Sequence, residues 1–184
     1  MTINTKTLAA IDIGTNAIRL FISNVEEYPT ETLFKKIAFL RVPIRLGEDV
    51  FTTGEIGQQK RKRLCETMQG FSYIMSAFNV ESYKAYATCA MREARNGKSV
   101  AEQIQKECDL NIEIISGTKE AETIFAGGMN EVVDDDKTYL YVDVGGGSTE
   151  VIVYSKSVKV EACSFPLGTV RMLNDAVDKE EMKH

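Results

Sequence analysis

Two stretches of the chain share one order of apolar and polar positions: an apolar run, an aspartate, a few small residues and a second apolar run. Residues 139–154 have the sequence Tyr-Leu-Tyr-Val-Asp-Val-Gly-Gly-Gly-Ser-Thr-Glu-Val-Ile-Val-Tyr, in which Asp143 ends the first run. Residues 8–22 repeat the order around Asp12. Short runs of β-branched and aromatic residues joined by glycine predict two strands and a tight turn. The chain therefore contains two similar predicted hairpins, which suggests a duplicated unit.

The periodicity between and after these hairpins alternates between the strand repeat and the helix repeat. Residues 48–53 are expected to form a loop. Strands are predicted at 7–13, 17–24, 32–44, 82–87, 111–115, 138–144, 149–155 and 158–164. Helices are predicted at 54–78, 88–95, 99–108 and 118–132, with a further helix starting near Gly168. Alternating strands and helices predict the α/β class.

The two hairpins divide the predicted fold into two pseudo-symmetric lobes, residues 1–135 and 136–184. An acidic run at 134–136, Asp-Asp-Asp, is typical of an exposed connector between them. If each lobe directs its turn toward a shared cleft, the two turns can grip a chain of phosphates from both sides. This hypothesis fails if the carboxylates of Asp12 and Asp143 lie on separate surfaces.

Composition narrows the class of protein. The 184 residues are 43% hydrophobic and have a net charge of −5, which supports a real core and argues against general binding of nucleic acid. The N-terminus has no signal-peptide pattern and no run approaches about 18 apolar residues, so we expect a cytoplasmic protein without a membrane segment. The four cysteines form no Cys-x-x-Cys pair and are expected to be reduced and mostly buried. His184 is the only histidine, which leaves carboxylates for proton transfer.

The second predicted turn has the composition of a metal-phosphate site. Glycines can adopt positive φ and direct successive N–H groups into one concavity, so Gly145, Gly146 and Gly147 suit a phosphate, together with Ser148. Carboxylates flank the turn, and carboxylates are ligands that Mg²⁺ uses. No lysine follows the glycines, which excludes a Walker loop. An ordinary glycine-rich hairpin is the alternative.

Two further stretches place charged residues where a strand ends and a helix begins, and open α/β sheets bind ligands at such strand ends. After the strand that ends at Ser116, Glu120 and Glu122 lie in the first turn of the next helix, where simple complementation of the helix dipole would also explain them. After the strand at 82–87, Arg92 offers a guanidinium that suits phosphate, but a lone helical arginine is also a common surface cation. Position alone leaves both alternatives open.

Five motifs together resemble the exopolyphosphatase / guanosine-pentaphosphate phosphohydrolase family. In chain order they are Ala-Ile-Asp-Ile-Gly-Thr-Asn at 10–16, Ala-Thr-Cys-Ala-Met-Arg-Glu-Ala at 87–94, Ile-Ser-Gly-Thr-Lys-Glu-Ala at 115–121, Val-Asp-Val-Gly-Gly-Gly-Ser-Thr-Glu at 142–150 and Phe-Pro-Leu-Gly at 165–168. The resemblance implies an α/β, actin-like (ribonuclease H-like) fold of two lobes. It also implies Mg²⁺-dependent hydrolysis of a terminal phosphoanhydride bond.

The resemblance implies roles for individual residues as well. Glu120 corresponds to the general base that activates water. Metal-linked roles fall to Asp143, Glu150 and Asp12, and phosphate contacts to Arg92, Thr15, Asn16, Gly145, Gly146, Gly147 and Ser148. Lys119 and Glu122 depart from the family's motif, which has a glutamate and an arginine at these positions.

The family's catalytic core is longer than this chain, so we expect an incomplete second lobe. An unfinished lobe exposes a sheet edge and apolar surface, so the isolated chain is expected to be weakly active, unstable or oligomeric, for example a homodimer. Three functions compete: an exopolyphosphatase acting on inorganic polyphosphate, a guanosine-pentaphosphate 5′-phosphohydrolase, and a non-catalytic actin-like module that binds nucleotide or phosphate. The Ser-Gly-x-x-Glu-Ala motif favours hydrolysis.

Overall fold

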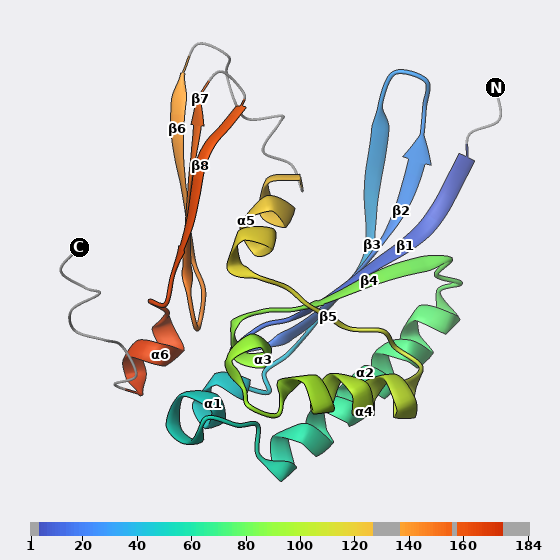
Figure 1. The fold of residues 1–184 in the computed structure, drawn as a ribbon. Helices are drawn as coiled ribbons and strands as arrows, with labels where there is room; N and C mark the ends of the chain where they lie inside the picture. Colours follow the sequence, from blue (N-terminus) through green and yellow to red (C-terminus); the bar gives the residue numbers. More distant parts are fainter. Residues whose placement is uncertain (1–3, 127–136, 156–157, 175–184) are drawn as a thin grey trace.

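The computed structural model describes residues 4–126, 137–155 and 158–174. Its strands form two separate sheets, which stand apart in Figure 1. The strands are β1 (Asn4–Ile13), β2 (Ile18–Glu27), β3 (Thr32–Val42), β4 (Ser82–Ala87), β5 (Glu113–Ile114), β6 (Thr138–Val144), β7 (Thr149–Ser155) and β8 (Val158–Phe165). The helices are α1 (Leu46–Thr53), α2 (Gln58–Ala77), α3 (Cys89–Glu93), α4 (Gly97–Cys108), α5 (Gly117–Ala126) and α6 (Thr169–Leu173).

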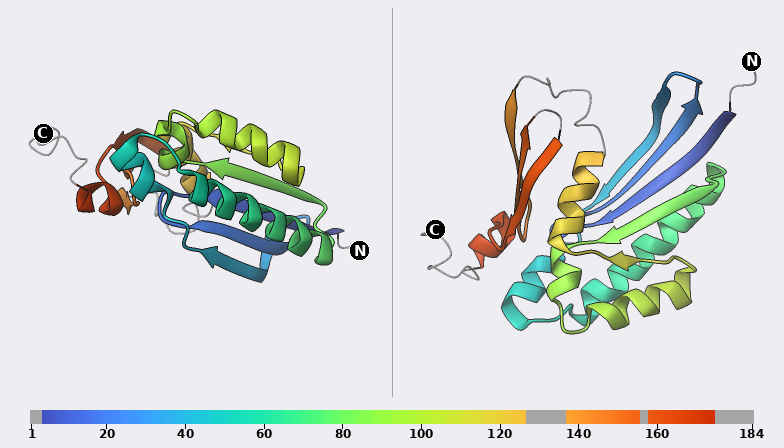
Figure 2. Two further views of the ribbon diagram at one scale, coloured as in Figure 1. Left: turned by 90° about the horizontal axis from the view of Figure 1, so that it is seen from below. Right: turned by 45° about the horizontal axis from the view of Figure 1, so that its top comes forward.

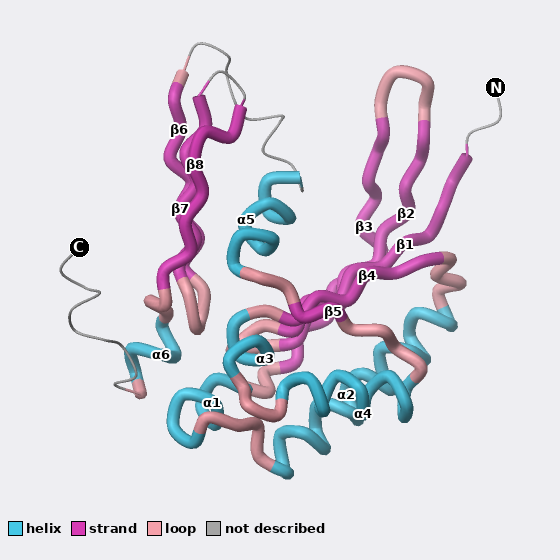
Figure 3. Tube along the Cα trace, viewed as in Figure 1, coloured by secondary structure: helices cyan, strands magenta, loops and turns pink. Residues whose placement is uncertain are grey.

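The first sheet has the strand order β3-β2-β1-β4-β5, which puts β1 at its centre. β1 pairs antiparallel with β2 along its whole length and parallel with β4 on its other edge. Helices α2 and α4 lie along one face of this sheet (Figures 2 and 3). The first Asp-x-Gly turn therefore leaves the end of a strand that is held on both edges.

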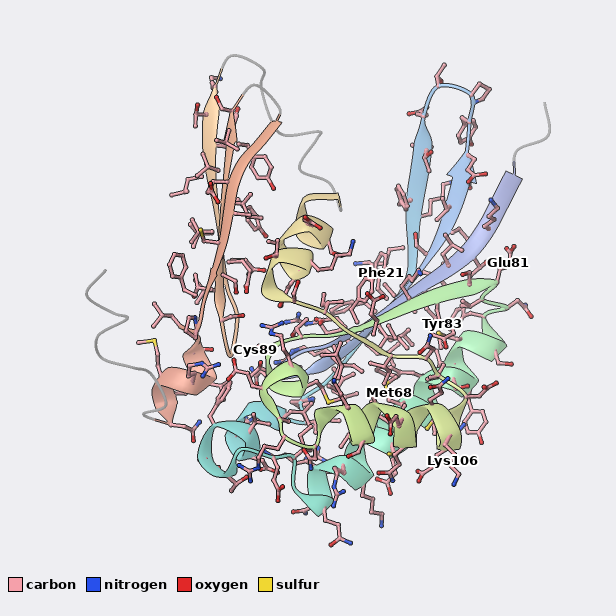
Figure 4. The ribbon with its side chains drawn as sticks, viewed as in Figure 1. Phe21, Met68, Glu81, Tyr83, Cys89 and Lys106 are labelled. Atoms are coloured by element: carbon pink, nitrogen blue, oxygen red, sulfur yellow. The ribbon has the colours of Figure 1, made fainter. Side chains whose placement is uncertain are left out.

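The alternating sequence of β2 gives the first sheet two different faces. Leu20 and Ile22 are fully buried in the core, whereas Arg19 and Phe21 on the opposite face are exposed. Figure 4 shows Phe21 on the other side of the sheet from Met68, a buried residue of α2. The core between the sheet and its helices includes Ile11, Ile13, Ile18, Leu20, Ile22, Leu64, Met68, Phe71, Val100 and Ile104.

The second sheet is an antiparallel meander in the order β6-β7-β8, and α5 packs against β7 and β8. Ala121 of α5 forms a small buried cluster with Ile152 and Tyr154 of β7. On the opposite face, Leu140 and Val142 of β6 are at least half exposed. Within the described residues, the second sheet is therefore buried on one face and bare on the other.

The prediction of a loop at 48–53 is wrong, because these residues belong to α1. Leu46 and Val50, one helical turn apart, are buried, but two apolar positions are too few to produce a periodic signal. Gly54 ends α1 in the left-handed conformation at φ 78°. The long helix therefore starts at Gln58, and not at Gly54 as predicted.

Other differences from the predicted elements are small. The strand predicted at 111–115 reduces to two paired residues, because β5 lies at the sheet edge and pairs with β4 alone. The end of the helix predicted to reach 132, the acidic connector at 134–136 and the proposed lobe boundary at 135 lie outside the described residues.

Cys65, Cys89 and Cys108 are buried free thiols, and the free thiol of Cys163 is exposed. Among the described helices, none combines the length and the apolar character that crossing a membrane requires.

Candidate active site

Both Asp-x-Gly turns line one cavity of about 680 Å³. Asp12 and Asp143 share this cavity, as the hypothesis of two facing turns requires. Arg92 is the one predicted site residue outside its wall. The predicted residues in the wall are Asp12, Thr15, Asn16, Glu120, Asp143, Gly145, Gly146, Gly147, Ser148 and Glu150.

The first turn is fixed by backbone bonds to the start of α1. The carbonyl of Thr15 accepts a hydrogen bond from the N–H of Gly47 (3.0 Å), and the carbonyl of Asn16 accepts one from the N–H of Arg45 (2.9 Å). Thr15 is almost completely buried. Because α1 packs into the core of the first sheet, these bonds hold the turn in one position.

The carboxylate of Asp12 forms an ion pair with Arg19, its cross-strand partner on β2. The guanidinium of Arg19 donates to Oδ2 of Asp12 over 2.8 Å. The pKa of Asp12 is nevertheless raised, because its burial outweighs the attraction of Arg19, and the negative charge of Asp143 adds to the increase. The two turns therefore bring their carboxylates close enough to influence each other.

The glycines of the second turn (145–147) do not use the positive φ that glycine allows, and Gly146 and Gly147 instead permit close packing. A Cβ atom on Gly147 would lie 2.4 Å from Sγ of Cys89 and 2.8 Å from Oγ1 of Thr15. A Cβ atom on Gly146 would lie 3.1 Å from Cβ of Thr15. Since real Cβ atoms rarely approach other atoms this closely, glycine lets the second turn press against the first turn and the start of α3.

Asp143 and Glu150 face the cavity from neighbouring strands. They are cross-strand partners on β6 and β7, so their side chains lie on the same face of the second sheet. Glu150 is only 2% exposed, and its Oε1 accepts a hydrogen bond from the hydroxyl of Ser164 (2.8 Å). The side chain of Asp143 makes no hydrogen bond to another described residue, so its carboxylate oxygens can accept a ligand.

Glu120, at the start of α5, is close enough to carboxylates of both hairpins for their charges to affect its pKa. Burial raises its pKa to about 7, and the negative charges of Glu150 and Asp12 contribute to the increase. The guanidinium of Arg92 opposes it from 3.4 Å. Dipole complementation alone predicts an exposed carboxylate, which describes Glu122 and does not describe Glu120.

Arg92 lies in a smaller neighbouring cavity of about 330 Å³. Its guanidinium donates to the carbonyl of Ile115 (2.8 Å) and to Glu120, so it is not a free surface cation. Ser148 lines both cavities and connects them. Arg92 therefore reaches the predicted site through Glu120 and not through direct exposure to the main cavity.

An outer wall of the main cavity is formed by residues outside the five motifs. Phe21 and Phe39 are cross-strand partners on β2 and β3, and both are at least one-third exposed on this wall. Lys84 and Tyr86 of β4 belong to the same wall. In the sequence, Phe21 lies two positions after Arg19 and so on the same face of the strand, which could have identified it, but no sequence signal pairs it with Phe39.

The donor set suits a hard cation that binds together with phosphate. No three acidic, histidine or cysteine side chains in the described chain converge to form a ready-made metal site. Asp12, Asp143 and Glu150 nevertheless offer oxygen donors around one cavity. Mg²⁺ commonly binds through one or two carboxylates, several waters and substrate phosphates. The residues therefore fit Mg²⁺ held jointly by the protein and a phosphate ligand.

Comparison with known proteins gives one consistent family. The model of the Ppx/GppA phosphatase family matches residues 13–184. A bifunctional 3-dehydroquinate synthase/phosphatase of Fusobacterium nucleatum is 32% identical over 168 residues, covering 89% of this chain and 25% of that protein. A putative exopolyphosphatase of Haemophilus influenzae is 28% identical, covering 91% of this chain and 50% of that protein.

Solved structures agree with this assignment. An exopolyphosphatase from Cytophaga hutchinsonii superposes with a TM-score of 0.83 at 29% identity, covering 92% of this chain and 53% of that one. A Ppx/GppA family member from Aquifex aeolicus superposes with a TM-score of 0.76 at 26% identity, covering 98% of this chain and 59% of that one. The predicted α/β, actin-like fold class is confirmed, and the chain spans about half the length of these two structures.

Proposed function

Because the chain belongs to the Ppx/GppA phosphatase family, we propose that it hydrolyses the terminal phosphoanhydride bond of inorganic polyphosphate. The observation that carries this proposal is the position of Glu120 in the wall of one cavity with both Asp-x-Gly turns. Such an arrangement provides a proton acceptor beside two phosphate-binding segments. Polyphosphate comes first among the candidate substrates because relatives with this fold are named exopolyphosphatases.

In this proposal Glu120 deprotonates the attacking water. A general base works best when its pKa lies near the working pH, and burial with neighbouring carboxylates raises the pKa of Glu120 to about 7. Arg92, which pairs with Glu120 from the neighbouring cavity, would favour negative charge on the phosphoryl oxygens through its positive charge and not through direct contact. The hydroxyls and backbone N–H groups of Thr15 and Ser148 would orient the terminal phosphate between the two turns.

Mg²⁺ is part of the proposal. Bound by Asp12, Asp143 and Glu150 together with the substrate, it would neutralise charge on the phosphate oxygens. The proximity of two of these carboxylates supports this role, since the negative charge of Asp143 contributes to the raised pKa of Asp12. Arg19 supplies part of the compensating charge to Asp12.

A guanosine pentaphosphate is the second candidate substrate, and the wall formed by Phe21 and Phe39 favours it. Inorganic polyphosphate has no apolar group to place there, whereas a nucleoside base can stack on exposed aromatic rings. Phe39 is 54% exposed, which leaves its ring accessible. Substitution of Phe39 by alanine should then raise the KM for guanosine pentaphosphate and leave the KM for polyphosphate unchanged.

Phosphate release from long-chain polyphosphate, guanosine pentaphosphate and ATP, each with and without Mg²⁺, tests the proposal. Mg²⁺-dependent release from polyphosphate supports the first candidate, and release from guanosine pentaphosphate alone supports the second. Binding of these compounds without release in the wild type would instead assign the chain to the third class, a non-catalytic binding module. A homodimer and a cytoplasmic location stay predictions, and sedimentation of the purified chain tests the first of them.

A further inference from the structure

Arg171 of α6 is a buried arginine that the sequence motifs did not single out. It is 8% exposed, although arginine is among the residues least often buried without a partner. α6 starts directly on the second turn: the N–H groups of Val170 and Arg171 both donate to the carbonyl of Gly146 (2.8 and 3.0 Å). A Cβ atom on Gly168 would lie 2.5 Å from that same carbonyl. The start of α6 and the second turn are thus one packed unit.

The side chain of Arg171 joins this unit to the first sheet's helices. Its Nε donates to the carbonyl of Gly147 (2.8 Å), and its Nη2 donates to the carboxylate of Glu93 in α3. Nη2 also lies 3.4 Å from Sγ of Cys89, and the guanidinium carbon lies 4.2 Å from the centre of the Phe51 ring in α1. The guanidinium of Arg171 therefore contacts the second turn together with α1 and α3, two helices that pack with the first sheet.

The bond to Gly147 also orients the next peptide N–H. The C=O of Gly147 and the N–H of Ser148 belong to one planar trans peptide, in which the two groups point in opposite directions. Holding the carbonyl against Arg171 therefore directs the Ser148 N–H away from the guanidinium. Figure 4 shows Cys89, the neighbouring contact of Arg171, at the start of α3.

We infer that Arg171 is a positioning residue that holds the second phosphate-binding turn against the first. It acts through the carbonyl of Gly147 and the carboxylate of Glu93, and it makes no direct contact with the main cavity. The inference rests on the proposed function for its effect on turnover, but not for its effect on the position of the turn. Lysine cannot replace it fully, because a single ammonium lacks the planar fork of donors.

Hydrogen exchange measured by mass spectrometry tests the position of the turn without requiring activity. In Arg171→Met, amides at 145–150 should exchange at least about tenfold faster, the loss expected for removing hydrogen bonds to a charged group. Amides at 8–22 should stay within about twofold of the wild type. Arg63→Met, on the exposed face of α2, is the matched control and should change neither segment.

Kinetics on inorganic polyphosphate add a readout that a purely structural role would not move. Misplacing the turn should lower kcat by about 10–100-fold with less than about a threefold change in KM. Arg171→Lys should recover less than half of the loss. Glu93→Gln weakens the same contact between Arg171 and Glu93. The kcat of the double variant Arg171→Met/Glu93→Gln should therefore be no lower than that of Arg171→Met alone.

Unchanged exchange at 145–150 in both Arg171→Lys and Glu93→Gln would overturn the inference, even if Arg171→Met does not fold. Lower thermal stability in these variants with unchanged exchange at 145–150 and wild-type kcat would overturn it as well. If the wild type releases no phosphate, the proposed function fails, and the exchange comparison still decides the role of Arg171.

Discussion

The two Asp-x-Gly hairpins have similar local sequences but rest on different supports. Behind β1 and β2 lies an extensive apolar core covered by α2 and α4. Behind β6 and β7, the residues that the structure describes form a cluster of three buried side chains on one face, and the described part of the other face is bare. The first turn is hydrogen-bonded to the start of α1, which packs with the first sheet. The second turn is hydrogen-bonded to α6 and is connected through Arg171 to Glu93 of α3.

This difference shows that a motif determines what a turn can bind, while its surroundings determine how firmly the turn is held. Both turns offer small residues and an aspartate to one cavity. Local stability in a protein follows buried apolar contact, and among the described residues the first hairpin has more of it. The second turn depends on contacts made across the cleft.

The largest expected effect comes from Glu120, which responds to charges from both hairpins. Glu120→Gln should lower turnover by about 10²–10⁴-fold, because it removes the proposed base and keeps the shape of the side chain. Phosphate release from polyphosphate at saturating substrate measures this. Glu122→Gln, on an exposed position of the same helix, is the control. Less than a tenfold loss in Glu120→Gln would remove this residue from the mechanism.

Truncation of one apolar residue in each sheet compares a buried position of the first sheet with a half-exposed position of the second. Leu20→Ala should lower the free energy of unfolding by about 2–5 kcal/mol, because Leu20 is fully buried and its loss leaves a cavity. Val142→Ala should lower it by less than about 1 kcal/mol, because Val142 is half exposed on the bare face of the second sheet. Urea unfolding followed by circular dichroism measures both values. Equal losses would show that the two sheets are equally well supported.

A methyl group at the junction of the two turns tests their close packing. Gly147→Ala should lower the free energy of unfolding by about 1–3 kcal/mol, because its Cβ would collide with Cys89 and Thr15. Gly70→Ala is the matched control, since a Cβ atom there meets nothing within 4 Å. This control should gain about 0.5–1 kcal/mol from helix propensity. A neutral Gly147→Ala would mean that the turns separate at little cost.

The pH dependence sharpens the role of Glu120 in both activity and stability. If its carboxylate is the base, kcat/KM should rise with pH around a midpoint of about 7, and Glu120→Gln should lack this limb. The pKa of Glu120 is raised from 4.5 in the reference state to about 7 in the fold, so the folded protein binds the proton more tightly. Its contribution to stability is therefore greatest below about pH 4.5 and is lost as the pH rises to about 7. Glu120→Gln should consequently be more stable than the wild type at pH 8, by about 1–3 kcal/mol, as thermal and urea unfolding would reveal.

Periodicity predicted nearly all of the strands and long helices, because strand and helix repeats are local properties of the chain. It failed at α1, where burial of Leu46 and Val50 by distant residues decides the structure. The composition of the second turn did not reveal the close packing at Gly147, because Thr15 and Cys89 are far from it in sequence. Contacts of this kind leave no periodic signal.

The candidate site was also predicted only in part from the sequence. Motifs with strand ends and glycines predicted the carboxylates that share the main cavity. They did not predict that Arg92 occupies the neighbouring cavity or that Arg171 connects the two halves. Both depend on the relative placement of segments that lie far apart in the sequence.

The central place of β1 has a consequence for ligands of different bulk. Asp12 lies near the end of β1, within a strand that is paired on both edges, so displacing it would disrupt the backbone pairing with both β2 and β4. The glycine-rich side is secured by a few individual contacts around α6. A bulky ligand would therefore displace the glycine-rich second turn outward, while the end of β1 stays in place.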